Sequence, residues 1–138
     1  MSQTPAKPKP RPAPESLPYW QAAKEHRLAL PRCEDCEKFW HPPSRTCPHC
    51  LSANFTFRDV SGRGKVFSFV TFHRVYRPAF AEEVPYVVAL VELEEGPRLL
   101  TNILGVSHEE VRCEMPVEVV FDDYDEDISI PKFRPVGR

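Results

Sequence analysis

The sequence predicts a mainly β protein that combines one short helix, a metal-binding ribbon and a small closed sheet. Three observations indicate this fold class. Four of the five cysteines lie within residues 32–50, as two Cys-x-x-Cys pairs. From residue 59 onward, runs rich in aromatic and β-branched residues are separated by short turns. Four of the five glycines fall where these runs begin, turn or bend, as the corners of a small barrel require.

Length and composition are those of a small globular protein. The 138 residues suit one ordinary domain, and a content of 41% hydrophobic and 28% charged residues is normal for such a domain. No run approaches the roughly 18 apolar residues of a membrane span, and the N-terminus lacks the apolar core of a signal peptide. We therefore expect a cytoplasmic protein without a membrane partner, in which paired cysteines bind a metal more often than they form disulfides.

Charge is distributed unevenly along the chain. The net charge is −2, but residues 82–127 contain fourteen acidic and two basic residues. This acidic second half gives no broad positive field for a phosphate backbone, so nucleic acid is not the expected partner.

The chain begins with a segment that predicts a tether and then a helix. Residues 1–15 are rich in proline and have no apolar period, which predicts a flexible, polyproline-like tether. Ser16 is placed to cap a helix over residues 16–27. Tyr19 and Trp20 give this helix a large aromatic surface. They either pack on their own domain or dock the helix on a partner, and the sequence leaves both possibilities open.

Cysteine spacing gives the strongest chemical signal. The predicted ribbon, residues 28–58, contains the pattern C-x2-C-x10-C-x2-C, in which each pair can form a tight knuckle. Two facing knuckles make a tetrahedral site that suits structural Zn2+, because four protein thiolates leave no position open for water. The predicted ligands are Cys33, Cys36, Cys47 and Cys50. A rubredoxin-type iron fits the same ligands, whereas a thioredoxin-like dithiol belongs to a βαβ unit that is not predicted here.

Five single residues near or beyond the knuckles also carry expectations. Many knuckles have Gly after the second cysteine, where a left-handed backbone helps the turn, but Glu37 and Leu51 occupy these places here. His41 and His49 are expected to be surface histidines rather than ligands. Cys113 has no partner and is expected to be a buried or half-buried small apolar side chain.

The region 59–138 predicts five strands. The runs cover residues 65–76, 86–91, 98–104, 115–124 and 128–136, with a Glu-Glu-Gly-Pro turn, an acidic turn, and one helical turn at "SHEEVR". In the first strand, Val66, Ser68 and Val70 are expected on one face, opposite Phe67 and Phe69. Five strands in a small closed sheet with a short connector have the outline of an OB-fold barrel.

A helix, a four-cysteine ribbon and a small barrel, in this order, resemble a known family. The chain is similar to the zinc-ribbon/OB-fold, acyl-CoA-associated proteins, a domain of unknown function, through "YWQAAKEHRLALPRCEDC", "PPSRTCPHC", "VSGRGKVFSFVTFHR", "VPYVVALVELEEGPRLLTNILG" and "MPVEVVFDDYDEDISIPKFRP". The resemblance implies a rubredoxin-like zinc ribbon followed by a five-stranded OB-fold barrel. The sequence departs from the family pattern at Glu37 and Leu51, and at Cys113-Glu114, where an apolar residue and Gly are usual.

The resemblance implies a protein partner. Members of the family are small subunits or fused domains that work with thiolase-superfamily enzymes. These enzymes include acetyl-CoA acyltransferases and the lipid-transfer-protein-like aldolase of steroid side-chain degradation, and a MaoC-type hydratase is sometimes joined through a proline-rich linker. The catalytic residues of these systems lie in the partner, so none is expected here. The expected assembly is a two-plus-two heterotetramer, with a coenzyme A thioester as a shared ligand.

Candidate contact residues follow from the chemistry of coenzyme A, which needs cations for its phosphates and apolar surface for adenine and pantetheine. The residues predicted to contact acyl-CoA or the partner are Tyr19, Trp20, Arg63, Lys65, Phe72, Arg74, Tyr76, Arg77, Phe80, Lys132, Phe133 and Arg134. Two other functions remain as alternatives: an OB-fold module that binds nucleic acid through stacking rings, and rubredoxin-like electron transfer.

Overall fold

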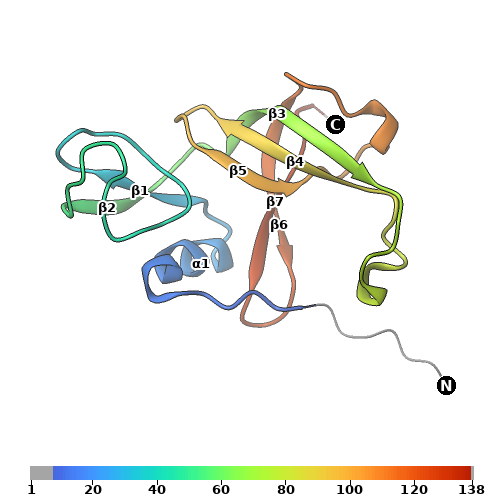
Figure 1. The fold of residues 1–138 in the computed structure, drawn as a ribbon, viewed down its shortest axis with the longest axis horizontal. Helices are drawn as coiled ribbons and strands as arrows, with labels where there is room; N and C mark the ends of the chain where they lie inside the picture. Colours follow the sequence, from blue (N-terminus) through green and yellow to red (C-terminus); the bar gives the residue numbers. More distant parts are fainter. Residues whose placement is uncertain (1–7, 138) are drawn as a thin grey trace.

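The computed structural model describes residues 8–137, which form two sheets and one α-helix (Figure 1). Strands β1 (Ala29–Cys33) and β2 (Phe55–Asp59) form the ribbon sheet. The barrel contains β3 (Arg63–Phe72), β4 (Tyr86–Leu93), β5 (Arg98–Asn102), β6 (Pro116–Asp123) and β7 (Ser129–Pro135), and short 3-10 turns lie at η1 (Pro14–Ser16), η2 (Pro78–Phe80) and η3 (His108–Glu110). Helix α1 (Leu17–Lys24) packs against β1 and β7, between the two sheets. The predicted fold class is confirmed.

Part of the predicted tether lies beside the barrel. Residues 8–13 have no regular secondary structure and run past the tip of the β6–β7 hairpin (Figure 1). Lys9 Nζ lies 2.9 Å from a carboxylate oxygen of Asp125 in the hairpin turn. Residues 1–7, which belong to the same predicted tether, lie outside the described part of the chain.

Helix α1 is shorter than the predicted helix, and Ser16 does not cap it. The Ser16 hydroxyl instead donates to the carbonyl oxygen of Ala13 at 3.0 Å, within η1. The helix ends at Lys24 because His26 adopts the left-handed conformation (φ 61°). The N–H groups of His26 and the following residue donate back to carbonyls of the last turn, as in a Schellman ending.

The barrel sheet has the strand order β5-β4-β3-β6-β7, and all neighbours are antiparallel. The sheet nearly closes on itself. A parallel bridge pairs Ile103 with Phe133, and the N–H of Leu104 donates to the Phe133 carbonyl at 2.8 Å. A side chain at Gly64 would meet the backbone of Glu92, so β3 needs glycine where it crosses β4. This OB-like topology was the one predicted.

The expected alternation along β3 is wrong from Phe67 onward. A β-bulge between Val66 and Ser68 shifts the register with β4 by one residue. Val66 is therefore buried inside the barrel, whereas Ser68 and Val70 are exposed on the outside. The sequence gives no sign of the extra residue, because Phe67 is itself a good strand former.

A single core joins the helix, the base of the ribbon and the barrel. Its buried members are Tyr19, Leu28, Leu30, Val66, Val87, Ala89, Val91, Leu93, Leu99, Ile103, Val111, Val117 and Phe133. The segment between β1 and β2 contributes only a small second cluster around Cys33, Trp40 and Cys47. Among residues 8–137, no helix is long and apolar enough to cross a membrane.

Candidate functional site

The four knuckle cysteines converge on one point. Cys33 ends β1, and Cys36, Cys47 and Cys50 lie in the segment that leads to β2. All four sulfurs lie within 4.8 Å of one another, and the Sγ–Sγ distances are 3.5 Å for Cys33–Cys50 and 3.6 Å for Cys36–Cys47. Sulfurs bound to tetrahedral Zn2+ at about 2.3 Å stand roughly 3.8 Å apart. The cluster therefore fits one zinc ion, held by the predicted ligand set.

Backbone groups close each knuckle. The N–H of Glu37 donates to the Cys33 carbonyl at 2.9 Å, and the N–H of Leu51 donates to the Cys47 carbonyl at 2.8 Å. Both Glu37 and Leu51 take the left-handed conformation, with φ of 64° and 66°, although glycine is the residue that favours it. The N–H of Cys36 also donates to Cys33 Sγ, which lowers the pKa of the Cys33 thiol to about 7.

One aromatic side chain supplies most of the packing inside the ribbon. Trp40 is buried beside Cys33 and Cys47, and its ring meets Phe55 edge-on with centroids 5.2 Å apart. Its indole N–H donates to Ser44 Oγ at 3.0 Å. Because this segment buries so little apolar surface, we expect its stability to depend on a bound metal.

Two expectations about single residues are wrong. His41 is half-buried rather than exposed: its Nδ1 is buried and has no hydrogen-bond partner among the described residues, and burial lowers the pKa of the side chain to about 4. The ribbon folds back on α1, which brings the His41 ring to 5.4 Å from that of Tyr19. Cys113 is exposed rather than buried, because it lies in the turn that precedes β6. His49 is exposed, as expected.

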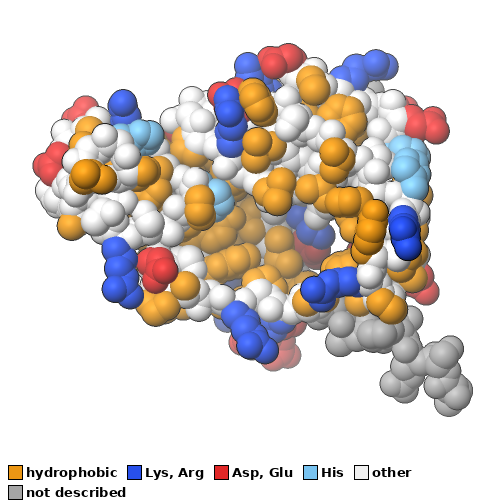
Figure 2. All heavy atoms as spheres, in the orientation of Figure 1, with side chains coloured by type: hydrophobic (Ala, Val, Ile, Leu, Met, Phe, Trp, Pro, Cys, Tyr) orange, Lys and Arg blue, Asp and Glu red, His pale blue; other side chains and the backbone are white. Residues whose placement is uncertain are grey.

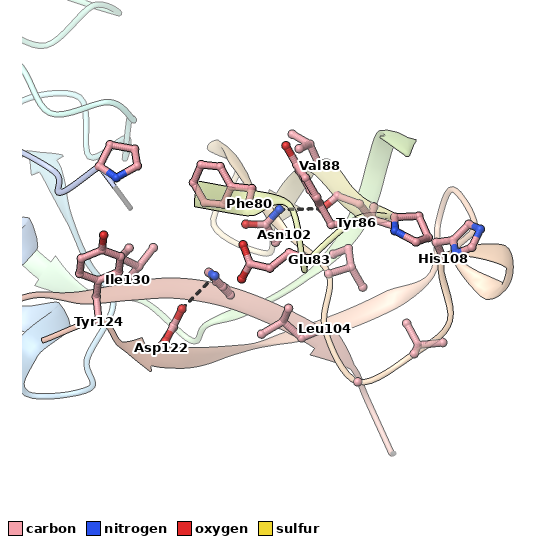
Figure 3. Close-up of a pocket in the computed structure, with 17 residues that line it drawn as sticks. Phe80, Glu83, Tyr86, Val88, Asn102, Leu104, His108, Asp122, Tyr124 and Ile130 are labelled. Carbon is pink, nitrogen blue, oxygen red and sulfur yellow. Dashed lines mark hydrogen bonds and ion pairs between the residues drawn. The ribbon is translucent and has the colours of Figure 1, made fainter. Parts of the chain in front are cut away.

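A hollow on the outside of the barrel is the second candidate site. It has a volume of about 550 Å3 and lies between the start of β4, residues 80–85 before it, residues 102–108 at the end of β5 and the β6–β7 hairpin, and Pro8 also lines it. Figure 2 shows hydrophobic side chains along its floor. Figure 3 shows Phe80 and Tyr86 on one side, and Ile130 on the other, against the hairpin. The walls are mainly apolar, as is usual for a small-molecule site.

Lys132 and Asp122 neutralise each other in the hollow, and Glu83 adds a second carboxylate to its lining. Lys132 Nζ lies 2.9 Å from a carboxylate oxygen of Asp122, and the Lys132 side chain is only 18% exposed (Figure 3). The Asn102 amide donates to the Val87 carbonyl at 2.8 Å, so it is also engaged. This arrangement suits an apolar or amphipathic ligand better than an anion.

The structure scatters the twelve predicted contact residues. Only Phe80 and Lys132 line the hollow. Tyr19 and Phe133 are buried in the core and have almost no surface for a contact, since α1 turns Tyr19 inward and the alternation along β7 points Phe133 into the barrel. Trp20 is half-buried against the same core.

The predicted cations do not form a phosphate site. Lys65 and Arg134 are paired with Glu114 and Glu118, at 2.9 and 3.1 Å. Arg63, Arg74 and Arg77 are exposed on different parts of the segment 63–77. Arg74 lies over the ring of Tyr76. The Tyr76 ring in turn lies 5.8 Å from that of Phe72.

Sequence reasoning missed most of the residues that line the hollow. Tyr86, Val88, Leu104 and Ile130 lie on or beside strands, and no motif marks them. One signal was present: the run from Tyr86 to Leu93 is apolar at nearly every position, although a strand with one solvated face normally alternates.

Comparisons with known proteins match both parts of the chain. A family model described as "ChsH2, rubredoxin-like zinc ribbon domain" matches residues 20–56, and one described as "ChsH2, C-terminal OB-fold domain" matches residues 57–122. A "DUF35 domain-containing scaffold protein" of Methanocaldococcus jannaschii is 36% identical over 78% of this chain and 77% of its own length. The chain belongs to the ChsH2/DUF35 family.

Two relatives of this ChsH2/DUF35 chain are much longer proteins. A "Probable enoyl-CoA hydratase alpha subunit" of Thermomonospora curvata is 42% identical over 96% of this chain but only 43% of its own length. The "3-oxo-4,17-pregnadiene-20-carboxyl-CoA hydratase alpha subunit" of Mycobacterium tuberculosis is 38% identical over 77% of this chain and 33% of its own. The chain thus spans less than half the length of these relatives.

A solved structure shares both the fold and much of the sequence. A chain of the "Ltp2-ChsH2(DUF35) aldolase" superimposes with a TM-score of 0.84 and 39% identity. The match covers 92% of this chain and 98% of that chain. The resemblance drawn from the sequence is therefore confirmed.

Proposed function

We propose that this chain is a non-catalytic accessory subunit that binds a thiolase-superfamily enzyme and supports binding of its acyl-CoA substrate. The observation that carries the proposal is the similarity, over nearly the full length of both chains, to a chain of the Ltp2-ChsH2(DUF35) aldolase. The reaction we favour is carbon–carbon cleavage of a steroid side-chain acyl-CoA, since one relative is named for a pregnadiene-carboxyl-CoA. Partnership with an acetyl-CoA acyltransferase is the alternative.

The metal centre has a structural role in this proposal. Cys33, Cys36, Cys47 and Cys50 would hold Zn2+ and fill its coordination shell. Bound zinc would supply folding energy to a segment that buries little apolar surface. The chemistry then belongs to the partner enzyme.

The hollow on the barrel is the part of this chain that would meet substrate. Its walls are mainly apolar, its one lysine is neutralised by Asp122, and Glu83 adds a negative charge. An apolar acyl group suits such walls, whereas the phosphates of coenzyme A would need cations that residues 8–137 do not gather. We therefore assign the acyl end of the thioester to the hollow and the nucleotide end to the partner.

The larger assembly follows from the same relatives. Thiolase-superfamily dimers would give a two-plus-two heterotetramer with this chain. Because two relatives are named hydratase alpha subunits and are more than twice as long as the matched region, a MaoC-type hydratase domain is a further expected partner. The proline-rich residues before α1 would serve as the connection.

Reconstitution tests the function. The wild-type chain is captured from its native lysate, the co-eluting thiolase-superfamily enzyme is identified, and both proteins are purified. Cleavage of a steroid side-chain acyl-CoA is then measured with each protein alone and with both together. Turnover is expected only with both. Turnover by this chain alone, or equal turnover by the enzyme alone, would contradict the accessory role.

Variants of the hollow test where the acyl group binds. In the reconstituted complex, Ile130→Asp and Leu104→Asp are expected to raise KM for the steroid acyl-CoA at least about tenfold, because a carboxylate in an apolar wall disfavours burial of the acyl group. Val136→Asp is the matched control, since Val136 is an exposed apolar residue that does not line the hollow. An unchanged KM in both hollow variants, with the complex intact, would show that the acyl group does not bind in the hollow.

A further inference from the structure

The outward side of β4 is apolar like its inward side. The inward residues Val87, Ala89 and Val91 are buried in the barrel core. The outward residues Tyr86, Val88 and Leu90 are only half-buried. Antiparallel sheets that face water on one side alternate apolar and polar residues, whereas strands covered on both sides read as continuous apolar runs. Strand β4 has the composition of a strand that is covered on both faces.

The neighbouring strands extend this apolar surface. Val70 on β3 stands opposite Val88, Phe72 opposite Tyr86, and Leu100 on β5 opposite Leu90. Directly opposed residues in antiparallel strands project to the same side of the sheet. We call this surface, made of Val70, Phe72, Tyr86, Val88, Leu90 and Leu100, the outer sheet face.

Within residues 8–137, no segment covers the centre of the outer sheet face. Leu100 is 74% exposed and Val70 is 55% exposed. Helix α1 packs elsewhere, against β1 and β7. Figure 2 shows hydrophobic side chains gathered over the β3–β5 sheet and continuing into the hollow. The same two residues, Tyr86 and Val88, belong to both surfaces.

At one end of the face, the charged side chains of the rim pair with one another. Lys65 Nζ lies 2.9 Å from Glu114 and 3.8 Å from Glu92, and Arg98 lies 3.7 Å from Glu92. Arg98 also lies over the ring of Phe67, 3.7 Å from its centroid. At the other end of the face, the exposed Arg74 lies over the ring of Tyr76, next to Phe72. An apolar centre with a polar rim is the pattern of a protein–protein interface.

We propose that the outer sheet face is the surface on which this chain docks the thiolase-superfamily enzyme. The inference rests on the proposed function and adds where the enzyme binds. It favours the enzyme over a second copy of this chain because the face runs directly into the hollow. An enzyme seated on the face would cover the mouth of the hollow and bring its own catalytic groups close to an acyl group bound there.

Charge substitution at the centre of the face tests the proposal. The double variant V70R/L100R is compared with V136R, which places the same side chain at another exposed apolar position. Thermal unfolding and zinc content check that both variants fold. Dissociation constants are measured by calorimetry with the purified thiolase-superfamily enzyme that the wild-type chain recovers. V70R/L100R is expected to weaken binding at least about 30-fold, because buried unpaired charges at an interface centre are costly, and V136R is expected to bind like wild type.

The outcomes separate the two proposals. If wild type binds the enzyme and V70R/L100R binds equally tightly, the docking face is wrong and the accessory function stands. If wild type does not bind the enzyme, the proposed function itself fails. If wild type alone forms dimers in sedimentation experiments and V70R/L100R is monomeric, the face is a self-association surface and the docking proposal is overturned.

Discussion

The ribbon, residues 28–58, and the barrel, residues 59–137, are stabilised in different ways. The ribbon segment between β1 and β2 has a buried cluster of Cys33, Trp40 and Cys47, in which two of the three members are metal ligands. The barrel has an extensive apolar core that also receives side chains from α1 and β1. One region depends on a metal ion and the other on burial of apolar surface.

This difference shows which groups stabilise each region and which surfaces are left to bind other molecules. In the ribbon, four sulfur atoms form the metal site, and between β1 and β2 Trp40 is the one buried side chain besides the cysteines. In the barrel, the core lies inside, which leaves the outer sheet face and the hollow free to contact other molecules. The comparison therefore makes separate predictions for the two regions, in metal content and in unfolding free energy.

Removing one metal ligand has the largest expected effect. Cys47→Ser should abolish stoichiometric zinc and unfold residues 34–54, because zinc binding contributes on the order of 10 kcal/mol in model peptides. The barrel strands should keep their slow amide exchange. Metal analysis and hydrogen-exchange mass spectrometry measure both results.

Cys113→Ser is the control for the ligand variant, since Cys113 is exposed and distant in sequence from the knuckles. It should leave zinc content and exchange unchanged. Full zinc content in Cys47→Ser, or fast exchange throughout the barrel, would contradict the division between the two regions. Iron instead of zinc in the wild-type protein would reopen the electron-transfer alternative.

Truncating the largest buried barrel side chain has the next largest effect. Phe133 is fully buried, so Phe133→Ala should lower the free energy of unfolding by about 3–5 kcal/mol. Urea unfolding of the zinc-loaded protein measures this change. Leu100→Ala, at an exposed position, should stay within about 0.5 kcal/mol of wild type. Similar losses in the two variants would show that the core is not where the structure places it.

His41 adds a pH-dependent effect at the contact between the ribbon and α1. Burial lowers its folded-state pKa to about 4, whereas the unfolded chain has the ordinary value near 6.5. The unfolded state therefore binds more protons in this window, so stability falls as pH drops through 6.5 towards 4. Between pH 7 and pH 5.5 the loss from this group is about 1 kcal/mol.

His41→Phe tests this assignment, because it keeps a ring against Tyr19 and removes the titration. Urea unfolding at both pH values, with zinc content verified, should show a smaller pH dependence than in wild type. His49→Gln, at an exposed histidine, should keep the wild-type dependence. An unchanged dependence in His41→Phe would mean that the side chain is not buried in solution.

Local patterns in the sequence were sufficient to predict the metal ligands and the strands. Cysteine spacing identifies the four thiols that the structure brings together, because each knuckle is a local turn. Apolar runs identify the five barrel strands, because their period is also local. The same reasoning applies to Phe133, whose burial follows from alternation with Lys132 and Arg134 along β7. The same burial leaves Phe133 almost no surface for the predicted contact.

Other features depend on contacts between distant segments. His41 is half-buried because the ribbon folds back on α1, and no pattern around residue 41 indicates that contact. The bulge at Phe67 depends on pairing with β4 and on the hydrogen bonds that join Val66 to residues 114 and 115. The hollow gathers side chains from four separated segments. Sequence periodicity describes one segment at a time, so it could not predict these features.

Replacing left-handed residues by glycine is the smallest expected effect, and it acts on both regions. Leu51 (φ 66°) closes a ribbon knuckle, and Glu114 (φ 70°) lies in the turn before β6. Relief of the left-handed strain, less the entropy that glycine loses on folding, should stabilise each site by about 0.5–1 kcal/mol. Leu51→Gly removes an exposed side chain, so no packing is lost.

The two glycine variants should change different quantities, one the zinc affinity and the other the stability of the barrel. Leu51→Gly should raise the affinity for zinc in a chelator competition and leave barrel unfolding unchanged. Glu114→Gly should raise the urea midpoint of the barrel and leave zinc affinity unchanged, although it also removes the ion pair with Lys65. That pair is exposed and contributes little, so the gain from the backbone should exceed the loss. If Leu51→Gly instead stabilised the barrel as much as Glu114→Gly does, the two regions would unfold as one unit, and metal and core would not be separate sources of stability.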